Sequence, residues 1–279
     1  MVRRSAGLVL GLGIASTLLL AACGGGSANT SGGTSSAKTT GTKTATSSAG
    51  AGTNAAPGVV SGQDQLNLPF NAVVFNTQGS TLSSAGPSKI TGSGFDYQGN
   101  TLNAKGVPTG QLPPVAIGST QVHFWVPPLG PGKKSALQLA DGIKPTSVTV
   151  KVQKPGPYKH IYLLEGAGNG PLDIQVTPTY SDGSQGKPVT VQIDDWCVLA
   201  VNGTPAPGAV PVLTAPSRLN DSGATATPAC GMEGIGASFN SSGKTVTAIT
   251  FGNVTLGPKN TQSPASASRA NITAATLVQ

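Results

Sequence analysis

The chain has 279 residues, of which 39 are Gly and 22 are Pro, and only 10% are charged. A chain of this length can bury one substantial core, and its Gly and Pro favour short strands joined by turns. The formal net charge is +7, but Arg3, Arg4, Lys38 and Lys43 precede the aromatic-containing part, where 13 basic residues face 10 acidic ones. Because the remaining lysines are scattered, the sequence predicts no nucleic-acid partner.

Residues 1–22 have the organisation of a secretory signal peptide, with Arg3 and Arg4 before an apolar run from Ala6 to Leu20. Leu20-Ala21-Ala22-Cys23 resembles the lipobox of bacterial lipoproteins. The resemblance implies that Cys23 is lipidated on sulfur, becomes the mature N-terminus and receives a further acyl chain, which together give stable anchoring. We therefore expect a bacterial lipoprotein on the extracytoplasmic side of the cell membrane. The alternatives are an ordinary secretory signal and an uncleaved membrane helix.

The next segment has the composition of a tether. Residues 24–57 are almost entirely Gly, Ser, Thr, Ala and Asn, with no aromatic residue. Such a segment buries too little apolar surface to offset the entropy of ordering. We predict that residues 23–57 form a lipidated Cys and a disordered linker, which would hold the domain of residues 58–279 roughly 30 to 35 Å from the lipid.

Residues 58–279 contain every aromatic residue of the chain and several segments that alternate polar and apolar residues. The clearest are Leu172–Tyr180 and Val189–Ile193, which read as a β-hairpin with Asp182-Gly183 in its loop. Ser147–Gln153 alternates in the same way, and the more apolar Tyr158–Leu164 is expected to be a central strand. Three further strands are predicted: a short one at Gln121–Val126, closed by Pro127-Pro128, and the closing strands Thr245–Leu256 and Ala270–Val278. Without intervening helices, these strands predict an all-β fold, an antiparallel β-sandwich or jelly roll.

The region from Tyr158 to Trp196 resembles a β-sandwich domain appended to bacterial glycoside hydrolases and to other secreted proteins. The residues that carry the resemblance are Ile161-Tyr162-Leu163-Leu164, Gly166-Ala167-Gly168-Asn169-Gly170, Tyr180-Ser181-Asp182-Gly183 and Asp195-Trp196. Weaker matches are Phe75-Asn76 with Gly79, and Ala140-Asp141-Gly142, which Ile143 follows where the family usually has Gln. The resemblance implies a galactose-binding-like sandwich with an accessory, non-catalytic role.

Cys197 and Cys230 are the two cysteines that remain once Cys23 is lipidated. In an exported domain such a pair favours a disulfide, which in the chain-entropy model stabilises by roughly 3 to 4 kcal/mol. A free buried thiol is the alternative, and neither Cys lies in a recognisable nucleophile motif.

No catalytic or metal constellation reaches motif quality. Cys197, Cys230, His123 and His160 lack the short spacing of metal-ligand pairs, and no calcium loop is recognisable, so we predict no cofactor and no metal. We expect His160 and Tyr162 to share one strand face, which would be open to solvent.

A glycosidase needs two carboxyl groups at one sugar, whereas Asp194 and Asp195 are adjacent and point to opposite faces. Glu165 and Glu233 are the only glutamates. We expect structural roles instead: Asp182 in a turn, and Asp195 at a strand end or on a backbone amide. The sequence therefore predicts no catalytic residues and a protein that is not an enzyme.

Sugar binding is the first functional hypothesis, because an exposed aromatic ring offers an apolar face to a pyranose. The candidate platforms are Trp125, Tyr97, Tyr158 and Tyr162, with Trp125 favoured, while Trp196 is assigned to the core. We expect the sandwich to bind a glycan or another envelope component. The alternatives are a structural or assembly lipoprotein that binds a protein partner and, less favoured, a hydrolase.

Overall fold

A computed structural model describes residues 60–74, 94–96, 109–129, 133–141, 144–198, 204–214, 217–219, 225–226, 230–258, 260 and 268–279. All of them belong to the unit Ala49–Gln279. The signal peptide, Cys23, the linker, Tyr97 and the Phe75-Asn76 and Gly79 matches lie outside the described residues, as do Gly142 and Ile143. Among the described residues, no helix has the length and apolarity needed to cross a membrane.

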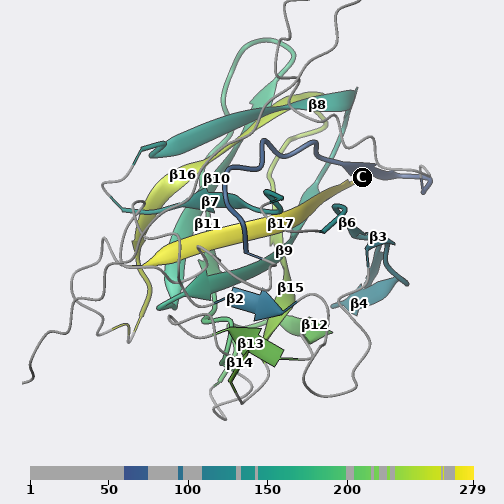
Figure 1. The fold of residues 1–279 in the computed structure, drawn as a ribbon. Helices are drawn as coiled ribbons and strands as arrows, with labels where there is room; N and C mark the ends of the chain where they lie inside the picture. The colour runs from purple at the N-terminus through teal and green to yellow at the C-terminus, as the bar shows by residue number, and fades with distance from the viewer. Residues whose placement is uncertain are drawn as a thin grey trace, which may run out of the picture. The chain divides into compact units, whose positions relative to one another are not determined.

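The described chain is all-β and antiparallel, which confirms the predicted sandwich class (Figure 1). One sheet has the strand order β1-β17-β9-β15-β12, with β7 also paired to β17, and a second has the order β11-β10-β16-β8. The strands of the larger sheet are β1 (Gln63–Gln65), β7 (Leu137–Leu139), β9 (His160–Gly168), β12 (Val210–Thr214), β15 (Gly231–Ser238) and β17 (Arg269–Val278). Those of the four-stranded sheet are β8 (Ser147–Gly156), β10 (Leu172–Tyr180), β11 (Val189–Ile193) and β16 (Val246–Leu256).

Three small sheets accompany these two. Their strands are β2 (Gly94–Asp96), β13 (Ser217–Leu219) and β14 (Thr225–Ala226) in one, β3 (Gly110–Gln111) and β6 (Trp125–Val126) in another, and β4 (Val115–Ile117) and β5 (Thr120–Val122) in the third.

The predicted hairpin is present: β10 and β11 pair from Leu172↔Ile193 to Val176↔Val189. Gly183 has φ 80° in its loop, and the Asp182 carboxylate accepts the Ser184 amide at 2.9 Å, so Asp182 is a turn residue as expected. Both features follow from Asp-Gly chemistry, because Gly reaches positive φ without strain and Asp bonds the amide two residues on.

The single strand predicted over Gln121–Val126 is wrong, because β5 ends at Val122 and β6 begins at Trp125. The strand is interrupted at His123, whose backbone amide and carbonyl form hydrogen bonds with side chains. Its amide donates to the Gln63 side chain at 3.1 Å, and its carbonyl accepts the Thr276 hydroxyl at 2.7 Å and the Gln65 amide. These bonds replace the pairing that a continuous strand would need.

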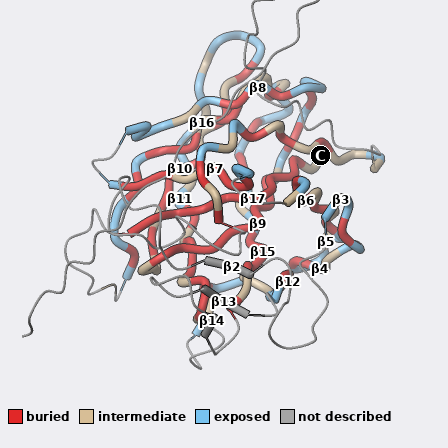
Figure 2. The backbone as a smooth tube through the Cα atoms, viewed as in Figure 1, coloured by how far each residue is buried: buried red, intermediate tan, exposed pale blue. Residues whose placement is uncertain are grey.

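Two hydrophobic clusters hold the unit together. The first lies between the two large sheets and includes Ile161 and Leu163 of β9, Ile174 of β10 and Phe251 of β16. The second covers the other face of β9 and includes Tyr162, Leu164 and Phe124. Residues Ile161 to Gly168 are consequently buried on both faces, and Figure 2 shows β9 in red along this stretch. Trp196, 7% exposed, belongs to the second cluster, which confirms its assignment to the core.

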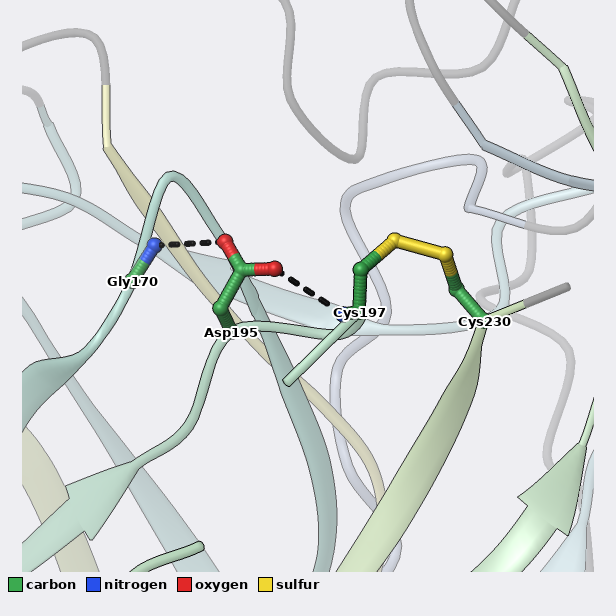
Figure 3. The surroundings of a disulfide bond; sticks show 4 residues. All are labelled: Gly170, Asp195, Cys197 and Cys230. Atoms are coloured by element: carbon green, nitrogen blue, oxygen red, sulfur yellow. Dashed lines mark hydrogen bonds between the residues drawn. A yellow bond between two sulfur atoms is a disulfide. The ribbon is translucent and has the colours of Figure 1, made fainter. Parts of the chain in front are cut away.

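The segment after β11 is fixed to β9 by backbone and side-chain bonds. Ala167 donates its amide to the Asp194 carbonyl at 2.6 Å and accepts the Trp196 amide at 2.9 Å. The Asp195 carboxylate accepts the Gly170 amide at 3.1 Å and the Cys197 amide at 2.9 Å (Figure 3). Asp195 thus bonds backbone amides, as predicted.

The predicted disulfide is present beside this segment. Cys197 is bonded to Cys230, with their Cα atoms 4.5 Å apart (Figure 3). Cys230 lies directly before β15, so the bond joins the segment after β11 to the strand next to β9.

Replacing Asp195 tests this connection. Asp195→Ala leaves the Gly170 and Cys197 amides without their acceptor, and we expect it to lower the free energy of unfolding by roughly 2 to 4 kcal/mol. Asp195→Asn keeps one acceptor oxygen and should lose about half as much. Urea unfolding of the oxidised protein measures both, and equal stability of Asp195→Ala and wild type would contradict the proposed role.

Candidate functional site

The outer face of the four-stranded sheet is polar because each of its strands alternates inward apolar and outward polar residues. In β10, Ile174 and Val176 belong to the core, whereas Asp173 and Gln175 lie on the other face. The outward residues of the four strands are mostly hydroxyl and amide side chains: Ser147, Thr149, Gln175, Thr177, Thr179, Thr190, Gln192, Thr250, Asn253 and Thr255. This face therefore offers many hydrogen-bonding groups and little apolar area.

One end of this face is hollowed into an open groove of about 470 Å³. Its polar lining consists of Asp141, Asp173, Gln175, Thr190, Asn253 and Thr255, with Ile174 and Val254 between them. The Asn253 amide donates to Gln175 Oε1 at 2.6 Å, which joins β16 to β10 across the groove. Thr190, Asn253 and Thr255 are exposed. We refer to this feature as the polar groove.

The polar groove is acidic. Asp141 is exposed and Asp173 is half-buried, and its lining contains no Lys or Arg among the described residues. Burial raises the pKa of Asp173 above its usual value, because removal from water disfavours the charged form. The only ion pair in the described part of the chain, Lys244 with Asp182 at 2.9 Å, lies at the hairpin loop.

The three predicted aromatic platforms that the structure describes, Trp125, Tyr158 and Tyr162, lie in different surroundings. Tyr158 is 4% exposed and its hydroxyl donates to the Lys154 carbonyl at 2.7 Å. Tyr162 is 6% exposed and donates to Thr120 Oγ1 at 2.8 Å. Neither ring presents an open face to a sugar, and the expectation that Tyr162 faces solvent is wrong because the second cluster covers that side of β9.

Trp125 is half-buried beside a second, much smaller hollow of about 10 Å³, which Phe70, Gln65 and Gln153 also line. This volume accommodates about one water molecule, not a sugar ring. No described aromatic residue lines the polar groove.

The Cys and His residues that were considered as a possible metal site each have other contacts. The two cysteines form the disulfide, His123 contacts the Gln111 side chain at 3.0 Å, and His160 contacts Ser238 at 3.0 Å. Within the described ranges, no group of three potential metal ligands is found.

The least expected feature is a pair of glutamates inside the sandwich. Glu165 of β9 and Glu233 of β15 are direct cross-strand partners, and they are 0% and 5% exposed. Strand alternation places both on the side of the core between the sheets, with Leu163 and Ile235. None of their four carboxyl oxygens has a hydrogen-bond partner among the described residues.

Asp194 lies next to this pair and is itself 3% exposed. Its side chain accepts hydrogen bonds from the Gln192 amide at 2.7 Å and from the Ala206 backbone amide. Burial, followed by the nearby Asp194 carboxyl, raises the pKa of Glu233 to about 8. Burial, followed by Asp194 and Glu233, also raises the pKa of Glu165. The folded protein therefore holds protons on this pair where free glutamates would release them.

Two facing carboxyl groups are what a glycosidase uses, but these two line neither of the two hollows described above. Neither Glu165 nor Glu233 lines the polar groove or the hollow at Trp125. Their protonation instead bears on the stability of the fold.

Sequence reasoning missed both features. Glu165 interrupts the apolar run of β9, which was the available signal for a buried acid, but nothing in the sequence shows that Glu233 lies opposite. From the sequence, the groove residues could be recognised only as polar residues on predicted strands, not as the lining of a groove.

Comparison with known proteins adds no relative: no protein-family model and no curated protein matches this chain.

The glutamate pair predicts a stability that falls as pH rises. Unfolded glutamate has a pKa near 4.5, and the folded pKa of Glu233 is about 8. Stabilisation is therefore complete below pH 4.5 and is lost progressively up to about pH 8, by at most about 1.4 kcal/mol per pH unit per group. Urea unfolding at pH 5, 6, 7 and 8 measures the slope.

Glu233→Gln, alone and with Glu165→Gln, should flatten this slope, because an amide side chain carries no charge at any of these pH values. Asp141→Asn is the control, since it neutralises an exposed carboxyl and should keep the slope. A wild-type stability that rises from pH 5 to pH 8 would contradict the assignment.

Proposed function

We propose that this chain is a lipid-anchored protein of the bacterial envelope whose sandwich binds a short glycan segment, without catalysis, in the polar groove. The observation that carries the proposal is the groove itself. Its hydroxyl, amide and carboxyl groups are the donors and acceptors that sugar hydroxyls need. Its volume of about 470 Å³ is typical of small-molecule sites.

The strand arrangement suits an extended ligand. Thr190 of β11, Gln175 of β10 and Asn253 of β16 come from three consecutive strands. Neighbouring strands lie about 4.8 Å apart, so the groove crosses about 10 Å of sheet. A short oligosaccharide can lie across the strands and bond to each of them.

The expected binding is weak. Each hydrogen bond to an exposed side chain contributes roughly 0.5 to 1.5 kcal/mol net, and no described aromatic ring adds stacking. We expect a dissociation constant of about 0.1 to 1 mM, which corresponds to a binding free energy of about 4 to 5.5 kcal/mol. Several copies anchored on one membrane can nevertheless hold a polymer by multivalency.

A protein partner is the alternative. Protein interfaces have an apolar core, but Leu256, 36% exposed, is the only large exposed hydrophobic residue in the described ranges. This distribution favours a polar ligand over a protein surface.

Substitutions in the groove test the glycan site. The full-length protein, solubilised in detergent, is incubated with insoluble polysaccharides and cell-wall preparations, and the bound fraction is measured by sedimentation. The double variant Gln175→Ala/Thr190→Ala removes hydrogen bonds from two strands and should weaken binding at least about fivefold. Thr149→Ala, exposed on the same sheet but outside the groove, is the control. Failure to bind any glycan, or equal losses in both variants, would refute the proposed site.

The anchor rests on the lipobox-like sequence and is tested separately. Cys23→Ala removes the thiol that would carry the lipid, so the protein should remain unprocessed by the lipoprotein pathway. Partition between detergent and aqueous phases and metabolic labelling with a fatty acid measure the change. Unchanged labelling would show that Cys23 is not the lipidation site.

A further inference from the structure

We propose that the polar groove selects glycans that carry a protonated amine over their acetylated or anionic counterparts. This inference rests on the glycan site proposed above and concerns its ligand class. It follows from the charges in the groove, the surroundings of Asp173 and the position of the described cations.

The groove has carboxylates and no described cation in its lining. Asp141 and Asp173 both line it, whereas Lys144 and Lys151 are exposed and do not. No ion pair joins either carboxylate to another described residue. A ligand with positive charge therefore meets two acidic groups that have no counter-charge among the described residues, and a uronate or phosphate group meets like charge.

Asp173 is the more important of the two because it is fixed within the sheet. It pairs with Gln192 of β11 on one side and with Thr255 of β16 on the other. Both neighbours are neutral, and burial already disfavours the charged carboxylate. An ammonium group in the groove would supply the missing counter-charge. Asp173 should therefore discriminate more strongly between protonated amines and neutral ligands than a fully exposed Asp would.

The remaining lining groups do not depend on ligand charge. Gln175, Thr190, Asn253 and Thr255 offer hydrogen bonds to any sugar hydroxyl. General affinity and charge selectivity therefore come from different residues of one groove, and substitutions can separate them.

The experiment compares three oligosaccharides of equal length: a glucosamine oligomer, its N-acetylated form and a uronate oligomer. Calorimetric titration of the full-length detergent-solubilised protein is run below the pKa of the ligand amine. We expect the glucosamine oligomer to bind about two- to fivefold more tightly than the acetylated one, in line with a partly exposed ion pair. The preference should shrink at high salt, and the uronate should bind most weakly.

Asp173→Asn should remove most of this preference, because the amide carries no charge. It should weaken binding of the glucosamine oligomer more than binding of the acetylated one, because the amide can still form hydrogen bonds with sugar hydroxyls. Asp182→Asn is the control, because it changes the net charge by the same amount but Asp182 lies in the hairpin loop outside the groove. This variant should keep the wild-type preference for the glucosamine oligomer. Gln175→Ala should weaken binding of the glucosamine and acetylated oligomers alike.

The outcomes separate this inference from the proposed function. Equal binding of the glucosamine and acetylated oligomers, or tighter binding of the uronate, overturns the charge selection while the glycan site stands. A preference of undiminished size in Asp173→Asn overturns the role of this residue. Binding of none of the three, together with no binding to the polysaccharide panel, overturns the glycan site and the selection with it.

Discussion

The fold depends on the burial of β9 on both of its faces. Ile161 and Leu163 pack between the two large sheets, while Tyr162 and Leu164 on the other face of β9 belong to the second cluster, together with residues of the segment from β3 to β6. A strand in this position needs close neighbours. Gly236 lies opposite Tyr162, where a Cβ atom would come within 2.5 Å of the ring, so the ring occupies space that only glycine leaves free. The larger sheet thus has no open face at β9.

The four-stranded sheet has the opposite character, and the candidate site follows from this asymmetry. Its inward residues complete the core between the sheets, and its outward residues contact no second cluster. A one-sided sheet can carry exposed Thr and Asn side chains on its free face at little desolvation cost. The proposed binding residues and the core residues therefore lie on opposite faces of β10.

Period-two alternation explains what could be predicted from the sequence. It predicted β10 and β11 with the bounds that the structure shows, because each has one buried face. It did not place Tyr162 correctly, because β9 is buried on both sides and has no solvent face, and the Tyr162 hydroxyl bonds to Thr120. The groove and the glutamate pair were beyond reach, because they depend on which distant strands become neighbours.

The glutamate pair shows how such a core tolerates acids. A buried carboxyl that remains protonated avoids most of the cost of burying a charge, and unpaired oxygens still forgo the hydrogen bonds they would make in water. The free-energy cost of these missing hydrogen bonds can be tolerated where other interactions hold the surrounding backbone in place. Here Asp195 and the Cys197–Cys230 disulfide fix the segment that carries Asp194, and the pairing of β9 with β15 fixes both glutamates. Since none of these groups lines the groove, protonation in the core changes the stability of the sandwich, while the groups on the proposed ligand-binding face stay as they are.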